Sequence, residues 1–215
     1  MGLEDIPPGT LLHRDVREAL CERLRDMYSK GWVSGTGGGI CTRIGDELLL
    51  APTGVHKERV KPYDLFSKNL KTGELSKPIN AGIKPSECTP IFEAIIESCG
   101  AGAVAHSHGE YSVLAADLSA SDFLIIKNLE MLKGVEGCNN QEPHQVPIIS
   151  NTAREINLTG AVRNALEDPR FNKSYCILVR DHGAYIWGSD LDQVKKHLEV
   201  YDSLFRTTWK RASMK

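Results

Sequence analysis

The sequence contains an apolar run that ends in two histidines, His106 and His108. Residues 103–105 are Ala-Val-Ala, which is typical of a buried strand, and strand residues i and i+2 point to one face of a sheet. The two imidazoles are therefore expected side by side at the end of this strand. Imidazole suits divalent transition metals such as zinc. Because two such histidines are more often ordinary polar residues, the pair alone does not establish a metal site.

A third histidine, His182, follows another strand-like run at residues 175–179 and precedes Gly183. Three imidazoles that leave one coordination position open form the ligand set of many catalytic zinc sites. A second histidine turn after a buried run therefore raises the three-histidine metal site to an even choice. The alternative is that these histidines are ordinary polar residues. His144, in a polar loop, is assigned no role in this site.

Composition and charge bound the classes of protein to consider. The chain has 215 residues, is 41% hydrophobic and 25% charged, and has a net charge of -2. These values are typical of one globular domain, predicted over residues 11–215 after a flexible lead-in at residues 1–10. The acidic and basic residues are mixed and form no basic patch of the kind that binds nucleic acid. No apolar run is long enough to span a membrane. Six cysteines without a Cys-x-x-Cys pair, and no secretory pattern at the start, predict reduced thiols in a cytoplasmic protein.

Two glycine-containing stretches have the character of anion-binding turns. Residues 35–39 read Gly-Thr-Gly-Gly-Gly, and residues 52–54 read Pro-Thr-Gly. Turns of this kind expose backbone N–H groups that can bind a phosphate. The spacing matches neither a P-loop nor a dinucleotide-binding fingerprint, and a hairpin explains residues 35–39 equally simply. The basic residues that follow, Lys57 and Arg59 among them, are predicted to form a solvated surface.

Residues 84–90 predict the start of a helix. Thr89 is expected to be its N-cap and Pro90 its first residue, which places Ser86 and Cys88 at its N-terminus. The N–H groups at such an end attract anions. The sequence therefore offers a third element, after the two glycine-containing turns, beside which a phosphate can bind.

Two acidic residues have local explanations on pattern alone. Glu130 lies among apolar residues, and an exposed position is its simplest reading, although burial would raise its pKa into the range useful for proton transfer. Glu155 completes a Thr-x-x-Glu capping box that predicts a helix from Thr152 to Glu167. Asp190 is expected to cap a long final helix.

Strands and helices alternate irregularly, which favours α/β layers around a mixed sheet.

Five motifs occur together in one order, and their combination is far more specific than any one of them. The set resembles the class II aldolase/adducin-like superfamily, and within it the methylthioribulose-1-phosphate dehydratases, from about residue 20 to residue 209. The motifs are Gly-Thr-Gly-Gly-Gly at 35–39, Ala-Pro-Thr-Gly-Val at 51–55, Lys-Pro-Ser-Glu-Cys-Thr-Pro at 84–90, His-Ser-His at 106–108 and His-Gly-Ala-Tyr-Ile-Trp-Gly at 182–188.

This resemblance implies a three-layer α/β/α fold around a central mixed, largely antiparallel sheet, and a homotetramer with sites near subunit interfaces. It implies one zinc per subunit bound by His106, His108 and His182, with Glu130 as the catalytic acid/base. The implied reaction is the dehydration of 5-methylthioribulose 1-phosphate to 5-methylthio-2,3-dioxopentyl 1-phosphate in methionine salvage. The residues implied to contact this sugar phosphate are Ser86, Cys88, Gly37, Gly38, Thr53 and Gly54.

One departure within the superfamily separates the alternatives. Its sugar-phosphate aldolases and epimerase usually carry Ser-Ser-Glu before the helix that begins near residue 89, and that glutamate moves the proton. Here Cys88 stands at the glutamate position and Glu87 comes one residue earlier. Cysteine there resembles the dehydratases, whereas Glu87 keeps a class II aldolase or epimerase as the alternative. A non-catalytic module like the adducin head would be expected to lack the histidines.

Overall fold

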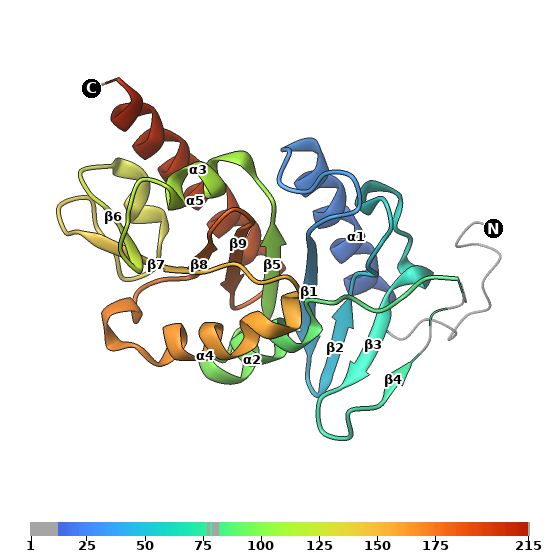
Figure 1. Ribbon diagram of the computed structural model, residues 1–215. Coiled ribbons are helices and arrows are strands. Elements are labelled where there is room, and N and C mark those ends of the chain that lie inside the picture. Colours follow the sequence, from blue (N-terminus) through green and yellow to red (C-terminus); the bar gives the residue numbers. More distant parts are fainter. Residues whose placement is uncertain (1–12, 77, 79–81, 215) are drawn as a thin grey trace.

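The computed structural model describes residues 13–76, 78 and 82–214. The predicted lead-in at residues 1–10 lies outside the described residues. The described strands form one open nine-stranded sheet in the order β4-β3-β2-β1-β5-β9-β8-β7-β6 (Figure 1). Neighbouring strands are antiparallel except β7 and β8. The strands are β1 (Gly39–Ile44), β2 (Glu47–Leu50), β3 (Phe66–Asn69), β4 (Leu75–Ser76), β5 (Ala103–Ser107), β6 (Phe123–Ile126), β7 (His144–Ile149), β8 (Cys176–Val179) and β9 (Gly183–Gly188).

Helices cover both faces of this sheet and give the chain three layers. One hydrophobic core contains apolar residues of α1, α3 and α5, and a second contains those of α2 and α4. Figure 1 shows α2 and α4 on one side of the strands and α3 and α5 on the other. The three-layer fold with a mixed, largely antiparallel sheet is therefore confirmed. The helices are α1 (Arg14–Ser29), α2 (Thr89–Cys99), α3 (Glu110–Ala116), α4 (Thr159–Glu167) and α5 (Leu191–Ser213).

Strand β5 lies near the middle of the sheet, and its side chains alternate between the two cores. Ala103 and Ala105 pack in the core with α5, whereas Val104 packs in the core with α2. His106 follows the second set and stacks on Tyr185 of β9, with ring centroids 4.2 Å apart. The period of two in a strand therefore fixes which face carries the histidines.

Two of the predicted helix starts are wrong in detail. Thr89 is the first residue of α2 rather than its N-cap, which is Cys88. The predicted capping box at residues 152–155 does not form, because the Thr152 hydroxyl donates to the Arg154 carbonyl and a short 3-10 helix, Glu155–Leu158, precedes α4. Glu155 is thereby freed from the backbone. Asp190 does cap α5, accepting hydrogen bonds from two N–H groups of its first turn.

Helix α5 is the longest described helix, and its surface is mostly polar. No helix within the described ranges combines the length and the apolar character that a membrane span needs.

The close approach of β9 to β5 depends on a glycine. A Cβ at Gly183 would overlap the Ser107 backbone carbonyl. We predict that Gly183→Ala lowers the free energy of unfolding by about 3 kcal/mol, because backbone atoms must shift. Gly160→Ala in α4, where a Cβ meets nothing within 4 Å, is the control and should be neutral or slightly stabilising. Urea unfolding measures both, and equal stability of the two variants would contradict this prediction.

Candidate active site

The structure brings the three predicted histidines together. His106 is the penultimate residue of β5, His108 directly follows the strand, and His182 lies in the turn between β8 and β9. The Nε2 atom of His106 lies 2.9 Å from Nε2 of His108 and 3.1 Å from Nε2 of His182. Four nitrogen or oxygen ligands at about 2.0–2.1 Å from a tetrahedral zinc would lie about 3.3 Å from one another. The three nitrogens therefore have the spacing of a metal ligand set.

The opposite ring nitrogens of two histidines contact oxygen acceptors. Nδ1 of His106 lies 3.1 Å from the carbonyl oxygen of Ala184, and Nδ1 of His182 lies 3.1 Å from Oδ1 of Asn151. Each Nδ1 therefore carries the ring hydrogen in the neutral form, and each Nε2 presents a lone pair to the centre of the cluster. Because facing lone pairs repel each other, the arrangement fits a cation between them.

A carboxylate completes the cluster. Oε1 of Glu155 lies 3.4 Å from Nε2 of His106 and 3.6 Å from Nε2 of His182, and Oε2 accepts a 2.8 Å hydrogen bond from Sγ of Cys88. One ligand atom from each histidine and from Glu155 all lie within 4.8 Å of one another. The described part of the chain thus contains a His/Glu cluster that is compatible with a metal site.

The charges of this cluster also suit a cation. Burial would raise the pKa of Glu155, but the neighbouring imidazoles of His106 and His182 outweigh burial and hold the pKa well below its usual value. Burial, followed by repulsion from the other two histidines, lowers the pKa of His108 to about 4. Burial and the charge of Glu155 raise the pKa of Cys88. At neutral pH His108 is therefore a neutral imidazole, Glu155 a carboxylate and Cys88 a thiol.

Sequence reasoning missed Asn151 and Glu155. Both follow β7, whose parallel neighbour β8 leads to His182. Because the carboxyl ends of parallel strands meet at the same edge of a sheet, polar residues directly after β7 were the available signal. Because the capping-box pattern explained Glu155 locally, the residue was not considered as a candidate for the site.

The glycine turn packs against the histidines. A Cβ at Gly37 would lie 2.6 Å from Nδ1 of His108, and one at Gly38 would lie 2.8 Å from the His106 carbonyl oxygen. The second predicted loop is tied to residue 84 by the Thr53 N–H, which donates to the Lys84 carbonyl over 3.0 Å. Gly54 beside it has a positive φ of 68°, which favours glycine. Gly37 and Gly38 therefore flank the cluster, whereas the bond to Lys84 places Thr53 and Gly54 in the loop beside residue 84.

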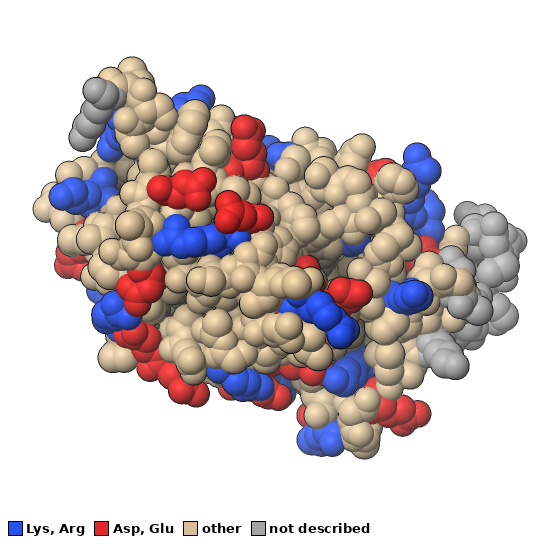
Figure 2. All heavy atoms as spheres, in the orientation of Figure 1, with Lys and Arg blue, Asp and Glu red and all other residues tan. Residues whose placement is uncertain are grey.

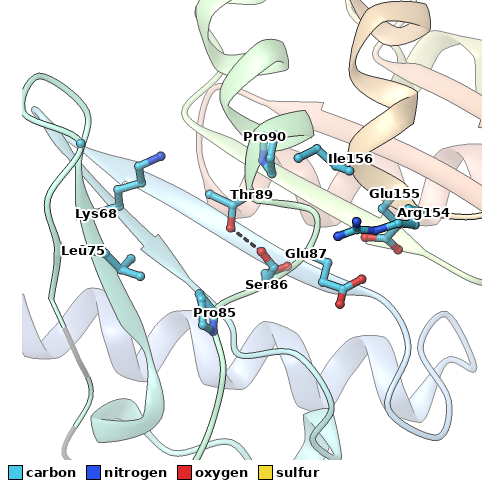
Figure 3. Close-up of a pocket in the computed structure, with 11 residues that line it drawn as sticks. Lys68, Leu75, Pro85, Ser86, Glu87, Thr89, Pro90, Arg154, Glu155 and Ile156 are labelled. Atoms are coloured by element: carbon cyan, nitrogen blue, oxygen red, sulfur yellow. Dashed lines mark hydrogen bonds between the residues drawn. The ribbon is translucent and has the colours of Figure 1, made fainter.

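A cavity of about 460 Å³ opens beside Glu155 (Figure 3). Ser86, Glu87 and Arg154 line it together with apolar side chains. Ser86 also accepts a hydrogen bond from the Cys88 N–H over 3.2 Å, which holds the start of α2. Glu87 lies in the cavity, whereas the Cys88 side chain contacts Glu155 of the cluster. Figure 2 shows acidic and basic side chains interspersed over this face.

Glu130 is not part of the cluster within one chain. Its side chain is 70% exposed and accepts hydrogen bonds from Lys133 at 2.7 Å and Asn140 at 2.6 Å. The Lys133 bond lowers its pKa. The 3-10 helix that begins at Glu130 packs by Leu132 in the core with α5, across the sheet from His106. Within one chain Glu130 is therefore exposed, the position that its sequence pattern favours.

The Class II Aldolase and Adducin N-terminal domain model matches residues 18–209. The chain belongs to this family. Among class II aldolase structures, an L-fuculose 1-phosphate aldolase superposes with a TM-score of 0.77 at 16% identity, over 96% of this chain and 90% of that one. YgbL from Escherichia coli, described as a putative aldolase/epimerase/decarboxylase, gives 0.75 at 19% identity over 90% and 88%. At these identities the likeness concerns the fold.

Curated relatives within the family are more similar in sequence. Methylthioribulose-1-phosphate dehydratase of Gallus gallus is 38% identical over 88% of this chain and 80% of its own length. The Homo sapiens protein of that name is 37% identical over the same shares. That of Schizosaccharomyces pombe is 36% identical over 90% of this chain and 88% of its own.

Asn151 offers a test of the cluster as a metal site. Its Oδ1 fixes the ring of His182, and removal of such a partner typically weakens metal binding about 10- to 100-fold. We predict this loss for Asn151→Ala, measured by competition with a chromophoric zinc chelator. Asn157→Ala, at an exposed position six residues further along, is the matched control. If both variants bind zinc as tightly as the unsubstituted protein, the Asn151 contact does not orient a ligand.

Proposed function

We propose that this protein is a zinc-dependent hydro-lyase that converts 5-methylthioribulose 1-phosphate to 5-methylthio-2,3-dioxopentyl 1-phosphate, as a cytoplasmic enzyme of methionine salvage. The curated relatives at 36–38% identity support this choice by their name. The observation that supports this function most directly is that the thiol of Cys88 donates a hydrogen bond to Glu155 of the histidine cluster. A three-histidine site suits an aldolase equally well, but an aldolase of this family would be expected to have a carboxylate at position 88.

We infer that His106, His108 and His182 hold one zinc per subunit, with Glu155 able to supply the fourth donor. The chemistry of such a site is Lewis-acid stabilisation of the negative charge that develops on a carbonyl oxygen when the neighbouring carbon loses a proton. Three neutral imidazoles preserve the positive charge that this needs. Tyr185, stacked on His106, keeps that ring in place.

The substrate phosphate is assigned to the turns beside the cluster, where Gly37, Gly38, Thr53 and Gly54 offer backbone groups and Ser86 a hydroxyl. Cys88 is assigned to the substrate pocket. Binding the phosphate, which does not react, holds the reacting carbons at the cluster and converts binding energy into orientation.

Glu130 is proposed to remove the C3 proton and to protonate the departing C4 hydroxyl. One carboxyl can serve both steps if it reaches both positions. Since Glu130 is exposed and on the far side of the sheet from His106 within one chain, another copy must bring it to the site. The proposed homotetramer with sites at subunit interfaces meets this requirement.

The reaction is tested by incubating the zinc-loaded protein with 5-methylthioribulose 1-phosphate and identifying the products by mass spectrometry. We expect loss of one water with the carbon skeleton intact. Two carbon fragments would instead establish the aldolase alternative and direct attention to Glu87. An unchanged substrate with zinc bound would contradict the substrate assignment, and an unchanged substrate without zinc would favour a non-catalytic module.

The contribution of Glu130 from a second copy is tested by complementation. Glu130→Gln and His106→Ala should each lower turnover by about 10²- to 10⁴-fold, and His106→Ala should also lose zinc. When the two variants are co-expressed, about a quarter of the sites should receive both native residues from different chains, so about a quarter of the activity should return. Failure to recover activity would show that Glu130 does not act between chains.

A further inference from the structure

The side chain of Lys57 is buried, although its sequence context predicts a solvated basic surface. It is 2% exposed and ranks among the largest fully buried side chains of the described residues. Transferring an ammonium group out of water is costly unless the group is hydrogen bonded. Burial lowers the pKa of Lys57, while the charges of Cys88 and Glu155 oppose that shift. A buried cation next to the histidine cluster therefore needs an explanation.

The hydrogen bonds of Lys57 join two loops that are distant in sequence. Its Nζ donates to the carbonyl oxygen of Thr36 over 2.7 Å and to that of Val55 over 3.2 Å. Its aliphatic part passes beneath Gly39, where a Cβ would lie 3.9 Å from Lys57 Cε. One side chain thus fixes the glycine turn at residues 35–39 and the loop at residues 53–55 relative to each other.

These two loops carry backbone donors that have no partner in the described structure. The N–H groups of Thr36, Gly38 and Gly54 donate to none of the acceptors in residues 13–76, 78 and 82–214. N–H groups in loops with left-handed residues form concave anion sites, and Gly38 and Gly54 have φ values of 69° and 68°. The close approach of Gly37 to His108 places the donors of the glycine turn beside the cluster, and Lys57 joins the loop with Gly54 to that turn.

We propose that Lys57 is a positioning residue for the phosphate of the substrate, acting from behind the two loops that bind it. Its hydrogen bonds hold the loops at the separation one phosphate requires, and its charge offsets the dianion through them. This inference rests on the proposed function for the identity of the phosphate ester. It adds to the proposed phosphate site a residue, Lys57, that lies outside the two turns.

The alternative is that Lys57 only stabilises the fold. The two roles give different results because a positioning residue changes the affinity for phosphate specifically. Lys57→Met keeps the length and apolar character of the side chain and removes its donors. Lys57→Arg keeps charge and donors. Lys61→Met, at an exposed lysine four residues along, is the matched control.

We expect Lys57→Met to raise KM for the phosphorylated substrate roughly 10- to 100-fold, the size of one or two lost charge-assisted contacts, while kcat changes only a few-fold. The affinity for inorganic phosphate, measured by calorimetry on the zinc-loaded protein, should fall by a similar factor. Zinc content should stay at the level of the unsubstituted protein. Lys57→Arg should recover most of the phosphate affinity, and Lys61→Met should change none of these quantities.

Unchanged KM and phosphate affinity in Lys57→Met would overturn the inference, even if its melting temperature falls. Should Lys57→Met fail to fold, a folded Lys57→Arg that loses phosphate affinity by 10-fold or more would overturn it, and one that retains the affinity would support it. Phosphate binding that depends on Lys57 in a protein that does not dehydrate the substrate would contradict the proposed function and leave this inference standing.

Discussion

The site depends on the convergence of three imidazole nitrogens whose lone pairs face one another. The pairing of β5 with β9 sets this convergence, because it stacks His106 on Tyr185 and brings the turn with His182 to the end of β5. Small residues make the approach feasible: a side chain at Gly183 would collide with the backbone of β5. The two cores on either side of the sheet then hold both strands in register.

Two charged side chains, the partly buried Glu155 and the buried Lys57, set the charge in and beside the cluster. Glu155 contributes a carboxylate among the imidazoles, and Lys57 places an ammonium behind the glycine turn. A charge is costly to bury alone. Lys57 donates two hydrogen bonds, and Glu155 accepts one from Cys88 and lies beside the imidazoles of His106 and His182. Together they place a carboxylate beside the proposed zinc site and an ammonium group beside the proposed phosphate site.

Apolar runs were sufficient to predict most central strands and the face that carries His106 and His108, since both follow from periodicity. Glu155 was missed because a capping box explained it locally, and that box does not form because a 3-10 helix precedes α4 and the Thr152 hydroxyl bonds elsewhere. The burial of Lys57 was missed because this burial depends on the glycine turn at residues 35–39, which is distant in sequence. A local sequence pattern does not predict such a contact. The proposed role of Glu130 requires a second copy of the chain, because within one chain its side chain is exposed and is not part of the cluster.

The account depends most directly on whether these side chains bind a metal through nitrogen and oxygen. X-ray absorption at the zinc edge of the zinc-loaded protein tests this. We predict one zinc per chain with three imidazole ligands at about 2.0–2.1 Å, an oxygen ligand and no sulfur. Failure to take up stoichiometric zinc, or a sulfur ligand from Cys88 in place of an imidazole, would contradict the account.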